Sequence, residues 1–398
     1  MNIAFVLLTH EPDEPAGIER ALASLADGLG ELGHRVLFVA AGPPSASDGP
    51  GLVRLKTLTL PRPMLVDQVL SLLPSPLPVQ REIESVLREQ DIDLVCWADA
   101  VAGLGYLSPA PPGVRTALMV HFMRTDESMK QSLEHKPGVV LPVSDYLTRD
   151  SARAGVDTTG WRALPNAVPA RSDPPSADVR EQLRRTGPVR TLARADPQKG
   201  IAQLLEAFPE EGIGRPVQII LATARFEFWP GMQEDVLDEC RRLADRLPDV
   251  EILPRIPWQD VQGFLAGASV ALAPSVEPET FGNVAAEALS VGTPVVGYAM
   301  GHLPVLVGEA GRLVDLSDGP GRLWAQVREL VDDAPAYHAL SRQAVSRAAG
   351  LTPVAVARTF LALTAPTAAP PGTGQHRHFR ARHRPVPPRG SDTSEERT

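Results

Sequence analysis

The apolar residues of this chain alternate between short continuous runs and stretches with helical spacing. Ile3 to Leu8 is a continuous apolar run, which is typical of a strand buried on both faces of a sheet. Positions 18, 22, 25, 29 and 32 are then apolar at helical spacing, and a second apolar run follows at 36–39. Such a strand–loop–helix–strand unit predicts a doubly wound parallel sheet in an α/β fold.

The same rhythm continues through the rest of the chain. We expect helical faces at 201–208 and 284–289, and further strands at 94–97, 116–121, 138–142, 189–193, 217–222, 250–253, 270–273 and 295–298. Residues 60–79 mix prolines with leucines and valines, which fits either a proline-broken helix on the core or a flexible loop beside an acceptor. Residues 169–188, rich in Pro, Ser, Asp and Arg, predict a linker.

The length of the chain predicts two domains, because 398 residues exceed what one compact core usually holds. We place the first domain at 1–185 and the second at 186–351. Thr352 and Pro353 are a good start for a helix ending near Leu363, since a hydroxyl N-cap precedes proline at the first helical position. Residues 365–398 have almost no apolar side chains, so we expect a disordered tail.

Composition and charge exclude several classes of protein. A net charge of −9 argues against general nucleic-acid binding, which needs a basic field. Cys96 and Cys240 lie too far apart in sequence for a disulfide framework or a cysteine zinc site, and we expect them reduced in a cytoplasmic protein. No apolar run is long enough for a transmembrane helix, and the first residues do not resemble a signal peptide. Arginine-rich basic residues and 40 prolines are typical of a GC-rich bacterial genome.

The segment after the predicted strand 270–273 has the features of a nucleotide site. Its loop carries Glu277 and Glu279, then Gly282 and Asn283 open a helix that carries Glu287. Amides at a helix start and the helix dipole favour an anion, and glycine lets a phosphate approach the backbone. A carboxylate one turn into the helix can accept two hydrogen bonds from a vicinal diol such as ribose. A charged loop before a surface helix is the plainer alternative.

A second cationic segment follows the predicted strand 189–193. Arg194 and Lys199 stand at its C-terminal end, before a helix, and open α/β sheets bind ligands at that edge. Together the two cations can hold a diphosphate and stabilise the charge that it gains on leaving. Two ordinary surface cations would look the same, but this segment and the Glu279–Glu287 segment suit different parts of one nucleoside diphosphate.

These motifs together resemble glycosyltransferase family 4. The resemblance rests on Arg-Ala-Asp-Pro-Gln-Lys-Gly at 194–200 and on Pro-Ser-Val-Glu-Pro-Glu-Thr-Phe-Gly at 274–282, followed by Glu287. Ala-Gly-Ile-Glu-Arg at 16–20, Val-Ser-Asp-Tyr at 143–146 and Leu-Pro-Asn-Ala-Val at 164–168 add to it. The family implies the GT-B architecture: two Rossmann-like domains with doubly wound parallel sheets face a cleft, and the helix at 352–364 returns to the N-terminal domain.

The resemblance also implies roles for individual residues. Arg194 and Lys199 would grip the donor diphosphate, Glu287 would bind the ribose, and Glu279 would lie close to the transferred sugar. Gly17 would let the N-terminal loop approach the diphosphate, and His121 would contact the sugar at the reaction centre. The remaining expected donor contacts are the backbone near Ile256, which would read the base, and Phe281, Gly282 and Asn283 at the helix start.

The chain departs from the family pattern at several positions. Ala16 and Ala167 replace common glycines, and His302 and Val305 stand where the family tends to have glycine and glutamate. The glycine-rich loop expected after the second strand of the C-terminal domain is replaced by Ala-Thr-Ala-Arg-Phe-Glu-Phe at 222–228. This replacement affects the region that would recognise the donor base.

Taken with this resemblance, the sequence predicts a metal-independent glycosyltransferase that is retaining, as the family implies. It would move a sugar from a UDP- or GDP-sugar, used as a co-substrate without any other cofactor, to a small soluble acceptor in bacterial specialised metabolism. Asp91 and Asp93 have the spacing of a metal motif but precede a strand, so we interpret them as a surface loop. We expect a monomer or homodimer with no peripheral membrane contact.

Other functions are compatible with parts of the pattern. A nucleotide-sugar epimerase can share the GT-B architecture and would need no acceptor, and a lipid or polysaccharide acceptor is a further alternative. A non-catalytic sugar-nucleotide binder would bind the donor without turnover. A dinucleotide-dependent oxidoreductase is disfavoured, because the first turn lacks Gly-x-Gly-x-x-Gly.

Overall fold

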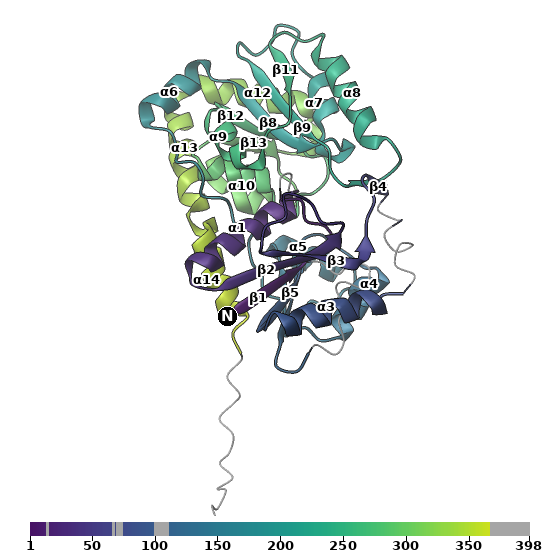
Figure 1. Ribbon diagram of the computed structural model, residues 1–398. Helices are drawn as coiled ribbons and strands as arrows, with labels where there is room; N and C mark the ends of the chain where they lie inside the picture. Colours follow the sequence, from purple (N-terminus) through teal and green to yellow (C-terminus); the bar gives the residue numbers. More distant parts are fainter. Residues whose placement is uncertain (13–15, 66–67, 69–74, 99–110, 367–398) are drawn as a thin grey trace, which may run out of the picture. The chain divides into compact units, whose positions relative to one another are not determined.

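The computed structural model describes residues 1–12, 16–65, 68, 75–98 and 111–366. Within the unit Met1–Thr364, it contains two six-stranded parallel sheets. The strands of the first sheet are purple to blue in Figure 1, and those of the second are teal to green. The predicted α/β fold with two doubly wound parallel sheets is thus confirmed.

The N-terminal sheet is built largely from the predicted apolar runs. Its order is β3-β2-β1-β5-β6-β7, in which β1 lies parallel to both β2 and β5. The strand order reverses beside β1, which creates a topological switch point between β1 and β5. The strands are β1 (Asn2–Val6), β2 (Arg35–Gly42), β3 (Leu52–Thr59), β5 (Leu94–Trp97), β6 (Arg115–Val120) and β7 (Val139–Pro142).

The C-terminal sheet repeats this topology with a different sequence. Its order is β11-β9-β8-β12-β13-β14, so its switch point lies between β8 and β12, which are paired in parallel. Four of the predicted strands have the predicted bounds, and β8 is one residue longer than expected. The strands are β8 (Val189–Arg194), β9 (Val217–Ala222), β11 (Val250–Leu253), β12 (Val270–Ala273), β13 (Val295–Tyr298) and β14 (Gly311–Val314).

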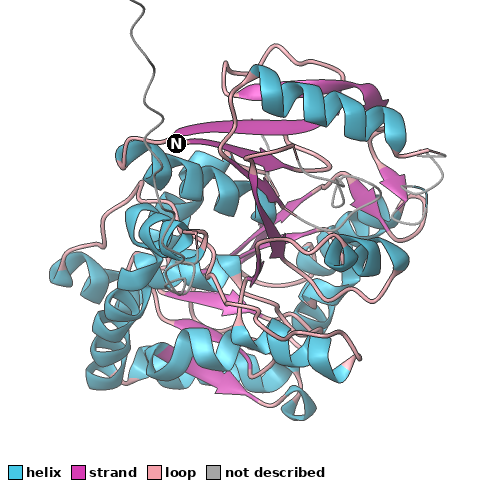
Figure 2. Ribbon diagram, turned by 90° about the horizontal axis from the view of Figure 1, so that it is seen from below, coloured by secondary structure: helices cyan, strands magenta, loops and turns pink. Residues whose placement is uncertain are grey.

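Helices border the strands of both sheets, as Figure 2 shows. Those that follow strands of the first sheet are α1 (Gly17–Glu31), α3 (Leu77–Glu89), α4 (Glu127–Glu134) and α5 (Asp145–Arg153). The other helices are α6 (Ala177–Thr186), α7 (Ile201–Glu206), α8 (Met232–Ala244), α9 (Val261–Ala266), α10 (Asn283–Ser290), α11 (Leu303–Val307), α12 (Pro320–Asp332), α13 (Ala334–Ala348) and α14 (Pro353–Leu363).

The last helix packs against the first, as expected for the returning C-terminal helix. Thr352 caps α14 by accepting from the Ala355 amide. Gly28 of α1 lies directly on the Pro353 backbone, where a side chain would clash. Phe360 is fully buried in one apolar cluster with Phe5 and Leu25. Helix α14 thus completes the apolar cover of the N-terminal sheet, with α1 and α14 adjacent in Figure 1.

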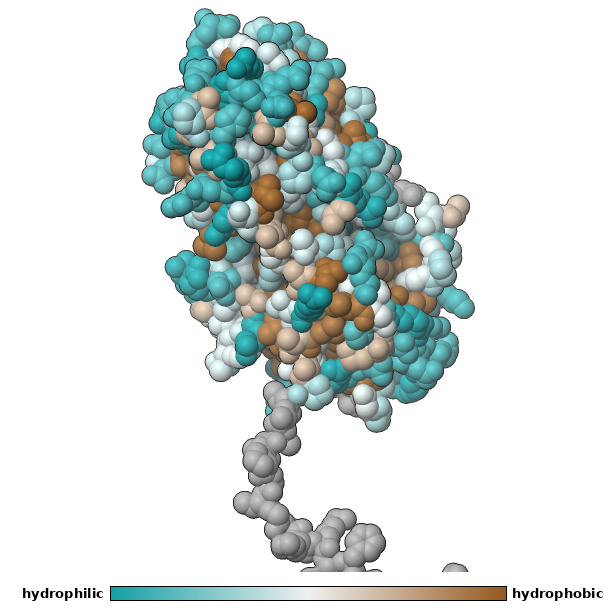
Figure 3. Space-filling view, turned by 90° about the vertical axis from the view of Figure 1, so that its left-hand side faces the viewer, coloured by the Kyte–Doolittle hydropathy of each residue, from teal (hydrophilic) through white to brown (hydrophobic). Residues whose placement is uncertain are grey.

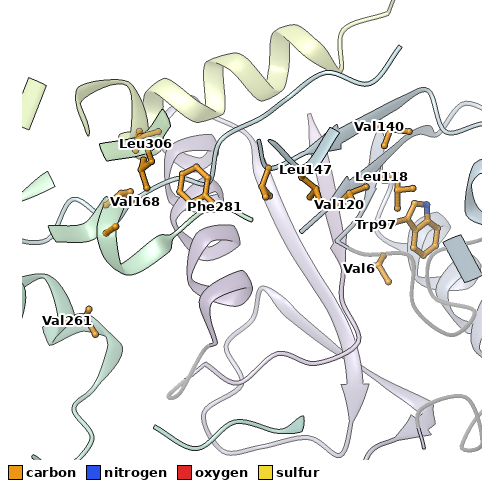
Figure 4. Packing of buried hydrophobic residues seen from close by; sticks show 14 of the residues in the cluster. Val6, Trp97, Leu118, Val120, Val140, Leu147, Val168, Val261, Phe281 and Leu306 are labelled. Carbon is orange, nitrogen blue, oxygen red and sulfur yellow. The ribbon is translucent and has the colours of Figure 1, made fainter. Parts of the chain in front are cut away.

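One apolar cluster extends from the N-terminal sheet into the C-terminal domain. Val6, Trp97 and Val120 of the first sheet belong to it, and so do Phe281 and Leu306. Figure 4 shows Phe281 beside Leu306, with Leu147 of α5 on the side toward the first sheet. The contact between the two sheet domains is therefore partly apolar, and Phe281 lies directly before the start of α10.

Two predicted features differ from the structure. The segment at 169–188, predicted as a linker, contains α6, whose Ser176 side chain caps the helix by accepting from Val179; its many polar residues suit an exposed helix and hid the helical spacing. In the described part of 60–79, Met64–Leu65 forms the short strand β4 and Leu77 begins α3. Residues 66–67 and 69–74 of that segment, and most of the tail predicted as disordered (367–398), lie outside the described residues.

The surface and the two thiols agree with the composition. On the face shown in Figure 3, hydrophobic residues lie scattered among hydrophilic ones. Across the described ranges, no helix has the length and apolar character required to cross a bilayer. Cys96 and Cys240 are both free and buried, as expected for ordinary structural thiols.

Candidate active site

The predicted cationic and acidic segments meet at the switch point of the C-terminal sheet. Arg194 is the last residue of β8, and Lys199 ends the short turn Pro197–Lys199 (η1) that follows. Glu279 lies in the loop between β12 and α10. Because β8 and β12 are neighbours with parallel direction, the two loops leave the same edge side by side. This edge is where open α/β sheets bind ligands.

Lys199 and Glu279 form an ion pair across this switch point. The Lys199 Nζ donates to Glu279 Oε1 at 2.6 Å, and the Ser275 hydroxyl donates to the same oxygen at 2.6 Å. Arg194 pairs with Asp196 at 2.8 Å, and the buried Asp196 also accepts from the Gln198 amide. Each of the two cations is therefore held by a carboxylate.

The charge state of Glu279 follows from these contacts. Burial raises the pKa of Glu279, but the charge and hydrogen bond of Lys199, with smaller effects of Ser275 and Arg194, outweigh burial and hold the pKa below its usual value. Glu279 is thus an anion at neutral pH, which keeps Lys199 in place electrostatically. The contribution of Arg194 also shows that its guanidinium lies close enough to Glu279 to act on it.

The loop that carries Glu279 is braced from the next βα connection. The His302 amide donates to the Glu279 carbonyl at 2.8 Å, and a Cβ on Gly301 would collide with the Glu279 backbone. Gly282, the N-cap of α10, has φ +93°, a left-handed conformation that favours glycine. An added Cβ would also lie 2.7 Å from Leu303 Cδ2, so backbone conformation and packing both favour glycine here. The close approach of a phosphate at Gly282 stays a prediction.

Residues of the N-terminal domain meet the start of α10. The Asn166 amide donates to Asn283 Oδ1 at 2.9 Å, and the Ser144 hydroxyl donates to the Thr280 carbonyl at 2.6 Å. Gly17, the first residue of α1, lies so near that an added Cβ would be 2.8 Å from Asn283 Nδ2. The start of α1 and the start of α10 therefore face each other, and both ends present amides suited to an anion.

Glu287 occupies a buried position one turn further along α10. It is 3% exposed, and its Oε2 pairs with Nη2 of Arg20 on α1 at 3.3 Å. Burial raises the pKa of Glu287, and the charge of Arg20 lowers it, with a net rise. Glu287, which is predicted to bind the ribose, is therefore already paired with a residue of the N-terminal domain in this structure.

Comparisons with known proteins show which family models and which relatives the chain matches. Residues 189–333 match the family described as "Glycosyl transferases group 1", and residues 15–171 match "Glycosyltransferase Family 4". Together the two matches span most of the chain, which therefore belongs to the glycosyltransferases that these two models describe. It is 28% identical to a phosphatidyl-myo-inositol mannosyltransferase of Mycolicibacterium smegmatis over 81% of this chain and 83% of that protein. It is 37% identical to a D-inositol 3-phosphate glycosyltransferase of Catenulispora acidiphila over 28% of each chain.

Solved structures show the same GT-B fold. The sucrose-phosphate synthase of Thermosynechococcus elongatus superposes with a TM-score of 0.71 and 19% identity, covering 91% of this chain and 98% of that one. Anabaena HepE, crystallised with UDP and glucose, gives a TM-score of 0.70 at 18% identity over 91% and 98% of the two chains. The predicted GT-B fold is thereby confirmed, while the family matches and the relatives show that the chain is a glycosyltransferase, which uses a nucleotide sugar.

His121 of this glycosyltransferase follows β6 at the edge of the N-terminal sheet. It is 4% exposed, and neither ring nitrogen has a hydrogen-bond partner among the described residues. Burial lowers the pKa of His121 to about 4, so the ring is neutral at pH 7. A buried imidazole with both nitrogens open can still donate or accept one hydrogen bond when a ligand arrives.

Two further predicted donor contacts differ in their surroundings. Ile256 follows β11, is half-buried and lines an open hollow of about 440 Å³ with Arg171, Gln259 and Phe264. Phe281 is 2% exposed and stacks on His302 with ring centroids 5.6 Å apart. The Phe281 side chain therefore acts in packing, and only its backbone remains for a donor contact.

The segment that replaces the family's glycine-rich loop contacts the N-terminal domain. Arg225 forms an ion pair with Glu11 and donates to the Leu60 and Pro61 carbonyls. The following strand β10 (Phe226–Glu227) pairs in parallel with β4. The local sequence at 222–228 does not reveal the pairing of β10 with β4, because β4 lies about 160 residues earlier in the chain.

The sequence analysis gave no role to three polar residues that form hydrogen bonds between the two domains. Arg20, Ser144 and Asn166 belong to motifs quoted for the resemblance, yet no role followed from them. Their partners lie 267, 136 and 117 residues away, which no local pattern reveals. Over the described ranges there is also no cluster of three or more His, Cys, Asp or Glu side chains suited to a metal ion.

Proposed function

We propose that this glycosyltransferase transfers a sugar from a UDP- or GDP-sugar to a small polyhydroxylated acceptor, with retention of anomeric configuration and without a metal ion. The single observation that supports it most is the Lys199–Glu279 ion pair at the β8/β12 switch point. There, two cations and a helix start stand together, which suits a diphosphate that leaves with developing negative charge.

In the proposed mechanism, Arg194 and Lys199 exchange their carboxylate partners for diphosphate oxygens when the donor binds. The amides at the start of α10 add their partial positive charge beside Gly282. These groups stabilise the oxygens of the departing diphosphate, and each such contact contributes on the order of 3 kcal/mol in the transition state. Because cations of the chain occupy this role, no metal is required.

The acceptor approaches from the N-terminal domain in this proposal. Retention follows if the acceptor hydroxyl attacks the face that the diphosphate leaves, with the leaving phosphate accepting the hydroxyl proton. Neutral His121 donates a hydrogen bond to a sugar hydroxyl, and the Glu279 carboxylate stabilises positive charge that develops on the sugar ring. Neither residue forms a covalent bond to the sugar.

The class of acceptor is proposed from the relatives. One of them is a mannosyltransferase of phosphatidyl-myo-inositol, and others act on D-inositol 3-phosphate, although the latter match only about a quarter of their length. An inositol or a similar cyclic polyol is therefore the first acceptor to test. A role in specialised metabolism stays a prediction.

The test begins with the donor and adds the acceptor afterwards. Titration calorimetry with UDP and GDP should give saturable binding for one of them, and the matching nucleotide sugars should release nucleoside diphosphate faster when a polyol is added. NMR of the product should show the anomeric configuration of the donor. Binding of neither nucleotide, or an inverted product, would overturn the proposal; an altered sugar without any acceptor would instead identify an epimerase.

A further inference from the structure

A buried ion pair links the two domains outside the diphosphate site. Arg20 lies on α1 of the N-terminal domain, Glu287 lies on α10 of the C-terminal domain, and their side chains are 11% and 4% exposed. Both charged side chains are removed from water in this contact. Desolvating two charges costs free energy unless each charge is well compensated by hydrogen bonds and by its partner. An exposed pair could be incidental, but one this deeply buried requires a reason.

The guanidinium of Arg20 is only partly satisfied. Its Nη2 donates to Glu287 Oε2 at 3.3 Å, while its Nε is buried without a hydrogen-bond partner among the described residues. Leaving a buried N–H open costs free energy, and native proteins seldom do so. An incoming group that accepts a hydrogen bond would remove this cost.

The same face of α10 carries a second incompletely satisfied contact. Asn283 is four residues before Glu287, so the two side chains lie one above the other on the helix. Asn166 donates to Asn283, yet its own Oδ1 is buried without a partner in the described structure. An open donor on Arg20 and an open acceptor on Asn166 therefore flank one helix face, and hydroxyl groups of a ligand could satisfy both.

We propose that Arg20 is a positioning residue for the donor nucleoside. It holds Glu287 through Oε2 and leaves Oε1 for the ribose hydroxyls, so that a residue of the N-terminal domain sets the affinity of the C-terminal domain for its donor. This inference rests on the proposed function, because it takes the ligand of Glu287 to be a nucleoside diphosphate sugar. It adds a requirement that the two domains be in contact for the nucleoside to bind tightly.

The surroundings of Glu287 leave Arg20 as its dominant charge. The elements packed against α10 are α9, α11, α13, β12 and β13. Their titratable side chains are Tyr298, Tyr337, His338, Arg342 and Arg347, and α1 itself adds Glu19, Asp27 and Glu31. Within the described residues, Glu287 forms its ion pair with Arg20.

The test separates positioning from simple support of the fold. Arg20→Met removes the charge with little change of shape, and Arg20→Lys keeps the charge. We expect Arg20→Met to raise the donor KM about tenfold at pH 7 and to change kcat much less, since a hydrogen bond to a charged group is lost. Arg20→Lys should recover most of the affinity. Arg242→Met, which breaks an exposed ion pair with Glu239 on α8, is the matched control and should leave KM unchanged.

The pH profile of the donor KM gives a readout that a structural role would not change. Without Arg20, buried Glu287 holds its proton to a higher pH, and a protonated carboxyl accepts ribose hydrogen bonds less well. As pH rises, the donor KM of Arg20→Met should therefore fall and level off at a higher pH than the wild-type KM does, because Arg20 lowers the pKa of Glu287 in the wild-type protein. Unfolding midpoints of all variants, measured beside the kinetics, show whether each is folded.

A double variant decides whether Arg20 acts through Glu287. In a Glu287→Gln background, adding Arg20→Met should raise KM no further, because the two changes remove one interaction. If Arg20→Met raised the donor KM by the same factor in the wild-type protein and in Glu287→Gln, the inference would be overturned. A donor KM of Arg20→Met equal to that of the wild-type protein would also overturn it. Failure of the wild-type protein to bind UDP or GDP would overturn the proposed function instead. If Arg20→Met unfolds, Arg20→Gln replaces it in every measurement.

Discussion

Lys199 and Glu279, eighty residues apart in sequence, meet with 2.6 Å between Nζ and Oε1. Arg194 is likewise paired with Asp196, so each cation of the candidate diphosphate site has a carboxylate partner. This arrangement fixes the cations before any ligand arrives, which reduces the reorganisation needed during the reaction. It also means that a diphosphate must compete with carboxylates for both cations.

This competition predicts opposite effects on binding and on rate. Glu279→Gln removes the carboxylate that holds Lys199, so the free nucleoside diphosphate should bind more tightly, by about tenfold. The same change removes negative charge beside the transferred sugar and should lower kcat. Calorimetry with the nucleoside diphosphate and steady-state rates measure the two effects. Glu277→Gln, two residues earlier and exposed, is the control; weaker nucleotide binding by Glu279→Gln would contradict this account.

The close contact between the two helix starts predicts a steric effect at Gly17. An alanine there would place Cβ 2.8 Å from Asn283 Nδ2, so Asn283 would have to shift and its bond with Asn166 would weaken. We expect Gly17→Ala to raise the donor KM several-fold, by roughly the loss of one hydrogen bond. Gly30→Ala on the same helix has nothing within 4 Å and should stabilise the protein without affecting KM. Equal KM values for both variants would rule out the contact as a functional one.

The fold was predictable because its signals are local. Short, largely apolar runs at 94–97, 217–222, 250–253 and 270–273 became β5, β9, β11 and β12 with the same bounds. Helix α6 was not predicted, because its buried residue is Arg180, and an arginine does not contribute to an apolar pattern. Its guanidinium is satisfied by the Ala268 and Val291 carbonyls, far away in sequence.

The candidate site was predictable only within one domain. The motifs place Arg194, Lys199 and Glu279 at strand ends of the same sheet, so topology alone brings them together. The partners of Glu287 and Asn283 come from the other domain, and their identity depends on how the domains meet. Sequence patterns carry no information on such contacts, which is why Arg20 and Asn166 emerged only from the structure.

The buried histidines predict a loss of stability in mild acid. Burial lowers the pKa of His121 and of His10 to about 4 each. In the folded protein these two rings therefore stay neutral at pH values at which the same rings of the unfolded chain take up protons. Stability is then full above the unfolded pKa near 6.5 and falls as pH drops toward about 4, by up to about 3 kcal/mol for each ring.

Removal of one ring tests this linkage directly. His121→Asn should make the unfolding free energy depend less steeply on pH between about 7 and about 4.5, measured by urea denaturation at several pH values. It should also lower kcat if the ring contacts the sugar. A pH dependence identical to that of the wild-type protein would show that His121 titrates normally in the folded state.

Catalysis without a metal predicts that chelation has no effect. Transfer rates measured after dialysis against EDTA should match those of untreated enzyme, and added Mg²⁺ or Mn²⁺ should not raise them. The physical reason is that, in the proposed mechanism, Arg194 and Lys199 supply the positive charge that a metal gives elsewhere. Loss of activity on chelation, restored by a divalent ion, would show that the leaving diphosphate needs a metal.

The role of Lys199 is the most direct test of the whole account. Lys199→Met should lower kcat by about a hundredfold, since one electrostatic contact to the leaving diphosphate is lost, while the unfolding midpoint changes little. Lys130→Met removes an exposed lysine of α4 that pairs with Glu127 and should retain full activity. The decisive measurement is the rate of nucleoside diphosphate release by the folded variants at saturating donor. A hundredfold drop for Lys199→Met alone is the predicted result, and a rate equal to that of Lys130→Met would contradict the account.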